Sequence, residues 1–194
     1  KAYLACQYEV ELMVEELVRQ LDEAGKLEDT VFVMSADHYP YALTDSELAE
    51  LYGIPEAGIH QNFDLLRNGL ILWCASMEEP VIVDTPCSSL DIIPTVSNLL
   101  GLEYDSRLLM GTDVLSDSVP LVILNQDGDG SAWNWLNKYG AYNSATKTFT
   151  PYEGFTATDE EIAAYVRQTN SVVQLKNKYA HLILEKNYYG YLFK

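Results

Sequence analysis

Basic residues are scarce in this sequence of 194 residues. Twelve lysines and arginines stand against 29 aspartates and glutamates, which gives a formal net charge of −17 at pH 7. A protein that binds nucleic acid through its phosphates needs a basic patch, and one that docks on anionic lipid needs a basic cluster. The composition therefore argues against nucleic acid as a partner and against membrane contact by this chain itself.

Cysteines are few, and long apolar runs are absent. Cys6, Cys74 and Cys87 form no C-x-x-C pair, so neither a disulfide framework nor a zinc knuckle is indicated. No stretch reaches the roughly 18 consecutive apolar residues of a membrane span, and no signal peptide is recognisable. The first residue is Lys1 and no initiator Met precedes it, so we expect the N-terminus to be a cut in a longer protein.

Hydrophobic periodicity predicts helices and strands in alternation over the first 124 residues. Apolar residues from Val10 to Leu21 recur at helical spacing, which predicts an amphipathic helix that packs on the core and ends near Gly25. A capping box at Thr44 predicts a second, short helix, and a third ends at Gly101. Apolar runs predict buried strands at residues 30–36, 69–75, 80–84 and 119–124.

Aromatic residues and turns dominate after Asn125. Trp133, Trp135, Tyr139 and Tyr142 surround a Lys-Tyr-Gly turn and predict a hairpin, with an edge strand at 147–150. A second capping box at Thr158 predicts a long helix to about Leu184, followed by a docking strip of three tyrosines. The turn Asp127–Gly130 resembles half of a calcium loop, but it lacks the closing Glu, so a plain acidic turn is favoured.

The dipeptide Asp37-His38 is the main candidate site. It follows the predicted strand TVFVMSA, and ligands of open α/β sheets bind outside the carboxyl ends of strands. A carboxylate beside an imidazole suits a divalent ion such as Mn²⁺ or Zn²⁺, although such pairs also cap helices or form solvated turns. His60, in the loop at 54–61, is either a further ligand or phosphate contact, or a surface histidine.

Four stretches of the chain resemble a known family. They are TVFVMSADHYPYAL, FDLLRNGLILWCASMEEPVIVD, SSLDIIPTVSNLLGLEYDSRLLMGTDVLSD, and the long helix with its ending NYYGYL. Together they resemble the C-terminal half of the sulfatase-like catalytic domain of the alkaline phosphatase superfamily. The likeness extends in particular to the lipoteichoic acid synthase-like group of Gram-positive bacteria.

The resemblance implies an α/β fold with a mostly parallel sheet flanked by helices, a small C-terminal antiparallel sheet and a long C-terminal helix. Residues 1–124 would belong to the α/β core, and residues 125–194 would add the small sheet and the helix to the same domain. Asp37 and His38 match the family's metal-binding pair, which usually holds manganese. Tyr39 follows the pair as in the family, and it either lines the substrate pocket or packs.

The resemblance also implies an activity. The intact parent would be a phosphotransferase or hydrolase of glycerophosphate-type esters, such as a lipid head group, on the extracellular face of the cell membrane, anchored by N-terminal membrane helices. The nucleophile and remaining ligands belong to the family's N-terminal half, which is missing here, so no residue of this chain is assigned as catalytic and the chain alone should be inactive.

Two alternatives remain open. The parent would be a true sulfatase if its missing half carried a Cys or Ser that is converted to formylglycine. Neither Cys74 nor Cys87 lies in the C-x-P-x-R setting of that conversion, so this chain does not decide. In the other alternative the chain is a non-catalytic structural or interaction module, in which Asp37 caps a turn and His38 packs.

Overall fold

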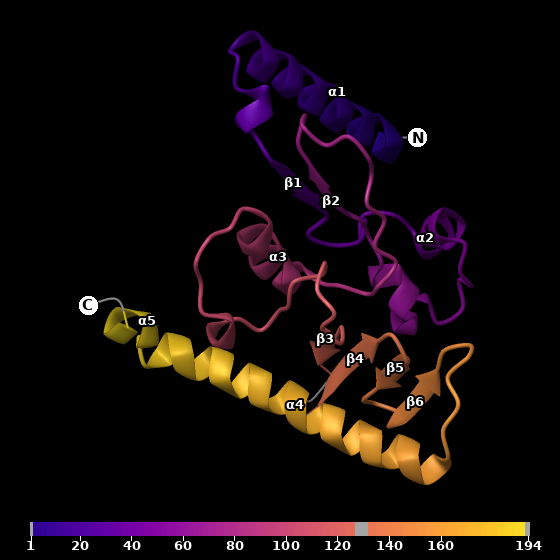
Figure 1. Cartoon of the computed structure of the whole chain (residues 1–194). Coiled ribbons are helices and arrows are strands. Elements are labelled where there is room, and N and C mark those ends of the chain that lie inside the picture. Colours follow the sequence, from indigo (N-terminus) through magenta and orange to yellow (C-terminus); the bar gives the residue numbers. More distant parts are fainter. Residues whose placement is uncertain (1, 127–131, 193–194) are drawn as a thin grey trace. The chain divides into compact units, whose positions relative to one another are not determined.

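The computed structural model describes residues 2–126 and 132–192 (Figure 1). The chain forms two compact units, Lys1–Val81 and Ile82–Lys194, and each is described by itself. The predicted turn Asp127–Gly130 lies outside the described residues. The grouping of residues 1–124 and 125–194 as parts of one domain stays a prediction. Among the described residues, no helix combines the length and the apolar character that crossing a membrane requires.

The first unit contains two helices and a two-stranded sheet. The helices are α1 (Ala2–Glu23) and α2 (Asp45–Tyr52), and the strands are β1 (Phe32–Ser35) and β2 (Leu70–Trp73). The two strands pair antiparallel. In the part of the chain that the structure describes, every strand pair is antiparallel, so the predicted mostly parallel sheet is not shown. In this unit the chain leaves β1, passes through α2 and enters β2 from the end at which β1 stops, so the two strands run in opposite directions.

The core of the first unit lies under the segment that follows β1. Leu48, Ile59 and Leu65 are almost fully buried, and Tyr39 and Leu43 pack against them. The predicted capping box is confirmed. The backbone N–H of Thr44 donates to Glu47 Oε2 at 2.9 Å, and the N–H of Glu47 donates to Thr44 Oγ1 at 3.4 Å.

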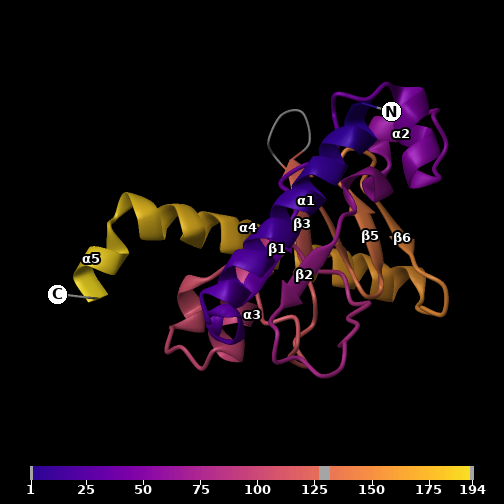
Figure 2. The same cartoon turned by 90° about the horizontal axis from the view of Figure 1, so that it is seen from above.

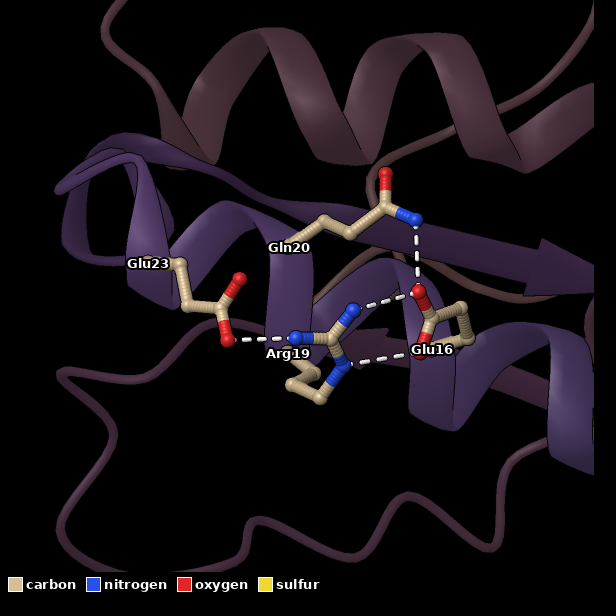
Figure 3. A network of polar contacts seen from close by, with 4 residues as sticks. All are labelled: Glu16, Arg19, Gln20 and Glu23. Atoms are coloured by element: carbon tan, nitrogen blue, oxygen red, sulfur yellow. Dashed lines mark hydrogen bonds and ion pairs between the residues drawn. The ribbon is translucent and has the colours of Figure 1, made fainter.

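Helix α1 is formed as predicted, but it has no buried residue. Its charged face carries a network in which Arg19 donates to Glu16 at 2.6 and 2.8 Å and to Glu23 (Figure 3). Hydrogen bonds from Arg19 lower the pKa of Glu16 to about 2. The predicted packing of the apolar face on a core is wrong for Val10 and Met13, which are more than half exposed. A 22-residue helix is about 33 Å long, whereas four-residue strands span only about 13 Å and cannot cover it.

The second unit is a four-stranded antiparallel meander packed on a long helix. The strands are β3 (Val122–Gln126), β4 (Trp133–Asn137), β5 (Gly140–Asn143) and β6 (Thr148–Pro151), and the helices are α3 (Ile92–Leu99), α4 (Asp159–Glu185) and α5 (Tyr188–Leu192). Trp135, Tyr142 and Val173 form its core, and Trp135 Nε1 donates to Asn170 Oδ1 at 2.8 Å. The predicted hairpin, edge strand and long helix are therefore confirmed.

Two strand predictions in this part of the chain fail wholly or in part. Residues 80–84 form no strand, and the strand predicted at 119–124 begins only at Val122. Val81, Ile82 and Val119 are all more than half exposed. An apolar run becomes a strand only where a neighbouring strand satisfies its backbone groups, and neither segment has one at these residues.

A buried polar cluster ties the loop after residue 105 to α3. Asp91 is 6% exposed, and its carboxylate accepts hydrogen bonds from the backbone N–H groups of Ser88 and Thr112, both at 2.7 Å. Thr95 is fully buried, and its hydroxyl donates to the Asp91 carbonyl at 2.6 Å and accepts from the Val114 N–H at 3.0 Å. This cluster explains why the loop stays folded without regular structure.

Candidate functional site

The Asp37-His38 pair lies just after β1, as predicted, and its side chains face each other. His38 Nε2 lies 3.4 Å from Asp37 Oδ1, and the side chains are 49% and 88% exposed, respectively. Neither residue caps a helix, because α2 is capped by Thr44. The pair is therefore open to solvent.

A tight turn fixes the orientation of the His38 ring. The carbonyl of Tyr39 lies 2.7 Å from His38 Nδ1 and also accepts the N–H of Tyr41 at 2.8 Å. This i to i+2 hydrogen bond defines a γ-turn centred on Pro40, whose ring favours the φ that the turn needs. A carbonyl oxygen only accepts, so His38 Nδ1 carries a proton and Nε2 is the ring nitrogen on the side of Asp37.

This geometry fits a divalent cation. Metal-bound histidines usually donate their second ring N–H to a carbonyl or carboxylate, and here Tyr39 supplies that carbonyl to His38. Two donor atoms that each lie about 2.1 Å from one ion are about 3.0 to 3.4 Å apart at octahedral and tetrahedral angles. The distance of 3.4 Å between Asp37 Oδ1 and His38 Nε2 lies in this range. The pair therefore has the donor chemistry and the spacing of two metal ligands.

Within the part of the chain that the structure describes, no third ligand joins the pair. Among the described residues, no three His, Cys, Asp or Glu side chains come together as a metal-binding group. Two protein ligands are fewer than the three or four of an ordinary zinc site. The described residues thus offer two candidate ligands.

His60 does not join the pair as a ligand. Its Nε2 lies 3.0 Å from Oδ1 of Asp45, the first residue of α2, and both side chains are about half exposed. The rings of His38, Tyr41, Tyr39 and His60 form a row, with centroids 4.4, 6.4 and 6.5 Å apart in that order. Tyr39 and His60 therefore lie on the same side of the unit as the pair.

Sequence reasoning missed two parts of this site. It did not recognise the Tyr39 carbonyl as the partner of His38, nor Tyr41 as a ring beside it. Pro40 could have indicated this turn, because proline in a loop favours a tight turn of the backbone. Asp45, the residue after the capping Thr44, was not recognised as the partner of His60.

A separate pocket of about 220 Å³ lies wholly within the second unit. Its lining includes Cys87, Asp91, Asp113 and Lys138. Asp91 already accepts hydrogen bonds from the backbone, and burial raises the pKa of the Cys87 thiol. A raised thiol pKa disfavours the nucleophilic thiolate, so Cys87 is not an activated nucleophile in this pocket.

Comparison with known proteins gives a family match over half of the chain. A model of the family described as Sulfatase matches residues 1–102. The chain is 32% identical over 112 residues to a lipoteichoic acid synthase of Staphylococcus saprophyticus. The aligned residues make up 55% of this chain and 17% of that protein. It is 26% identical over 147 residues to lipoteichoic acid synthase 2 of Bacillus subtilis. Here the aligned residues make up 75% of this chain and 22% of that protein.

A solved structure shares the fold. The crystal structure of the lipoteichoic acid synthase LtaP from Listeria monocytogenes matches 87% of this chain and 42% of that chain, with a TM-score of 0.61 and 20% identity. This similarity supports an alkaline phosphatase-like α/β fold. The chain spans about a fifth of the length of the sequence relatives described above.

Proposed function

Since the chain belongs to the sulfatase family, we propose that it is the C-terminal part of a metal-dependent phosphotransferase or hydrolase that acts on glycerophosphate-type esters of the cell envelope. The observation that carries this proposal is the Asp37-His38 pair, whose donor atoms are spaced and oriented as two ligands of one ion. The names of the relatives, lipoteichoic acid synthases, favour a phosphate ester over other substrates.

Each residue of the pair has a defined part in the proposal. Asp37 would supply negative charge to a Mn²⁺ ion and His38 would bind the ion through Nε2, while the Tyr39 carbonyl accepts a hydrogen bond from Nδ1 and so orients the ring. The bound metal would polarise a phosphoryl oxygen and stabilise the charge that develops on it. His60 and Tyr39 are proposed to contact the phosphate-bearing substrate from the row of rings beside the pair.

The remaining ligands and the nucleophile are proposed to come from a preceding part of the parent protein. The lack of a third candidate ligand beside the pair among the described residues, and the small share of each relative that the chain covers, support this division. The chain alone is then catalytically inactive. The parent is proposed to act on the extracellular face of the cell membrane, with its anchor upstream of Lys1.

The test is catalysis by the full-length gene product. The full-length protein with Mn²⁺ should release diacylglycerol from phosphatidylglycerol vesicles. Asp37→Ala and His38→Ala should each lower the rate more than about 100-fold, because a metal ion stabilises the transition state by several kcal/mol. Asp29→Ala is the matched control, since Asp29 is an exposed carboxylate that precedes β1 and should leave the rate unchanged. Equal rates for Asp37→Ala and Asp29→Ala would contradict the proposal.

A sulfuric-ester hydrolase is the second candidate, favoured by the name of the matching family model. The two chemistries separate on substrates with the same leaving group. Faster hydrolysis of p-nitrophenyl sulfate than of bis-p-nitrophenyl phosphate by the full-length protein would identify a sulfatase. If neither ester is cleaved and Mn²⁺ leaves the melting temperature unchanged, the non-catalytic alternative holds, because a ligand of the folded state must stabilise it.

A further inference from the structure

We propose that the C-terminal end of α4 together with α5 binds the surface of an anionic lipid membrane. The C-terminal surface consists of Leu175, Lys178, Tyr179, Lys186, Tyr188 and Tyr191, all of which are exposed. This inference goes beyond the proposed function, and it does not depend on the metal pair.

The surface is apolar and aromatic on the side of α4 that faces away from the core. Val173 packs against the sheet, whereas Leu175 and Tyr179, four residues apart and therefore neighbours on one face, are 49% and 58% exposed. The Tyr188 and Tyr191 rings of α5 stack with centroids 6.2 Å apart. Figures 1 and 2 show that this end of α4 and α5 extends beyond the edge of the β3–β6 sheet. The segment around Leu108 and Met110 contacts it through Tyr189 and Lys176, whereas Leu175, Tyr179 and Tyr191 stay about half exposed or more.

The charge of this region is opposite to that of the whole chain. Between Ile162 and Leu192 the only acidic residue is Glu185, whereas the basic residues are Arg167, Lys176, Lys178 and Lys186. Lys176 is half-buried and donates to a backbone carbonyl, so the other three present their charge to solvent. Residues 162–192 therefore carry a formal charge of +3 and the rest of the chain −20, so the overall composition concealed a local basic end.

These properties match an interfacial membrane contact. Helices that lie on membranes combine exposed apolar side chains with lysines, and tyrosine favours the boundary between lipid tails and water. Anionic head groups attract lysines that lie close to the membrane surface. The flexible lysine side chains extend past their apolar neighbours, so that the ammonium group reaches the head groups. The acidic remainder of the chain is repelled by the same lipids, so contact is expected only through the C-terminal surface.

The test is flotation of the 194-residue chain with vesicles of equal phosphatidylglycerol and phosphatidylcholine, and with pure phosphatidylcholine. Binding should require the anionic lipid and should disappear at 1 M salt, where charges are screened within about 3 Å. Each lysine close to the lipid contributes a factor of about five to the partition coefficient. The double variant Lys178→Glu and Lys186→Glu should therefore lower this coefficient at least about 25-fold. The matched control, Lys26→Glu with Lys147→Glu, changes the net charge equally but elsewhere and should lower it less than about threefold.

The apolar part of the surface has its own control. Tyr179→Ser should weaken binding more than about threefold, whereas Tyr8→Ser, at an equally exposed tyrosine of α1, should not. All these positions are exposed, and unchanged circular dichroism would confirm that the variants fold. Equal effects of the two double variants, or equal binding to both kinds of vesicle, would overturn the proposal. A dimer in sedimentation that Tyr179→Ser dissociates, without vesicle binding, would assign the surface to self-association instead.

Discussion

Replacing Thr95 with valine tests whether the buried polar cluster holds the second unit together. Valine keeps the shape of threonine but removes the hydroxyl that bonds both the Asp91 carbonyl and the Val114 N–H. A lost internal hydrogen bond costs about 1 kcal/mol, and a buried N–H left without an acceptor costs about 1 to 3 kcal/mol. Thr95→Val should therefore lower the free energy of unfolding by about 2 to 4 kcal/mol.

The matched control is Thr95→Ser, which keeps the hydroxyl and removes one methyl group, at a cost of about 1 kcal/mol. Urea unfolding followed by tryptophan fluorescence measures both variants. Trp73 belongs to the first unit, so a Trp73→Phe background leaves only Trp133 and Trp135, which report on the second unit. If valine costs no more than serine, the hydrogen bonds do not hold the loop and the reasoning is refuted.

Two further predictions concern backbone contacts and capping. Gly111→Ala should lower the free energy of unfolding, measured by thermal unfolding, by more than about 3 kcal/mol, because the new Cβ would lie 2.0 Å from the Leu90 carbonyl oxygen. The control Gly69→Ala places its Cβ in open space and should cost less than about 1 kcal/mol. Thr158→Ala should cost about 1 kcal/mol through loss of the α4 cap. Hydrogen bonds from the Thr158 backbone N–H and hydroxyl lower the pKa of Glu161 below its ordinary value, so this stabilisation is present above the unfolded pKa and is lost as the pH falls through the folded pKa. Carboxyl-carbon NMR titration should show a smaller lowering in Thr158→Ala, and an unchanged titration would contradict the capping argument.

Local sequence signals predicted most elements correctly. The capping boxes at Thr44 and Thr158, and the hairpin around Lys138, depend on contacts between residues close in sequence, so the pattern contains the whole cause. The strand predicted at 80–84 depends on a partner strand, which the pattern does not contain. The same limit applies to α1, where periodicity identified the apolar face but could not show what covers it.

The position of Asp37 and His38 after β1 was predictable, but their geometry was not, and their role as metal ligands stays a prediction. Residue type and position after a strand indicated Asp37 and His38, and the structure places them side by side. The hydrogen bond that sets the His38 tautomer comes from the Tyr39 backbone, and a backbone carbonyl leaves no mark on residue identity. His60 was indicated only by its type, and its actual partner, Asp45, lies 15 positions away.

Mn²⁺ titration of the 194-residue chain followed by NMR tests directly whether Asp37 and His38 supply two ligands of a metal site. Paramagnetic Mn²⁺ broadens the signals of nuclei close to it even when binding is weak. The account predicts weak binding, with the first broadening at the backbone and ring signals of residues 37–39, and loss of that broadening in Asp37→Ala. Broadening centred elsewhere, or unchanged in Asp37→Ala, would contradict the claim. Tight stoichiometric binding would show instead that the chain holds a complete site.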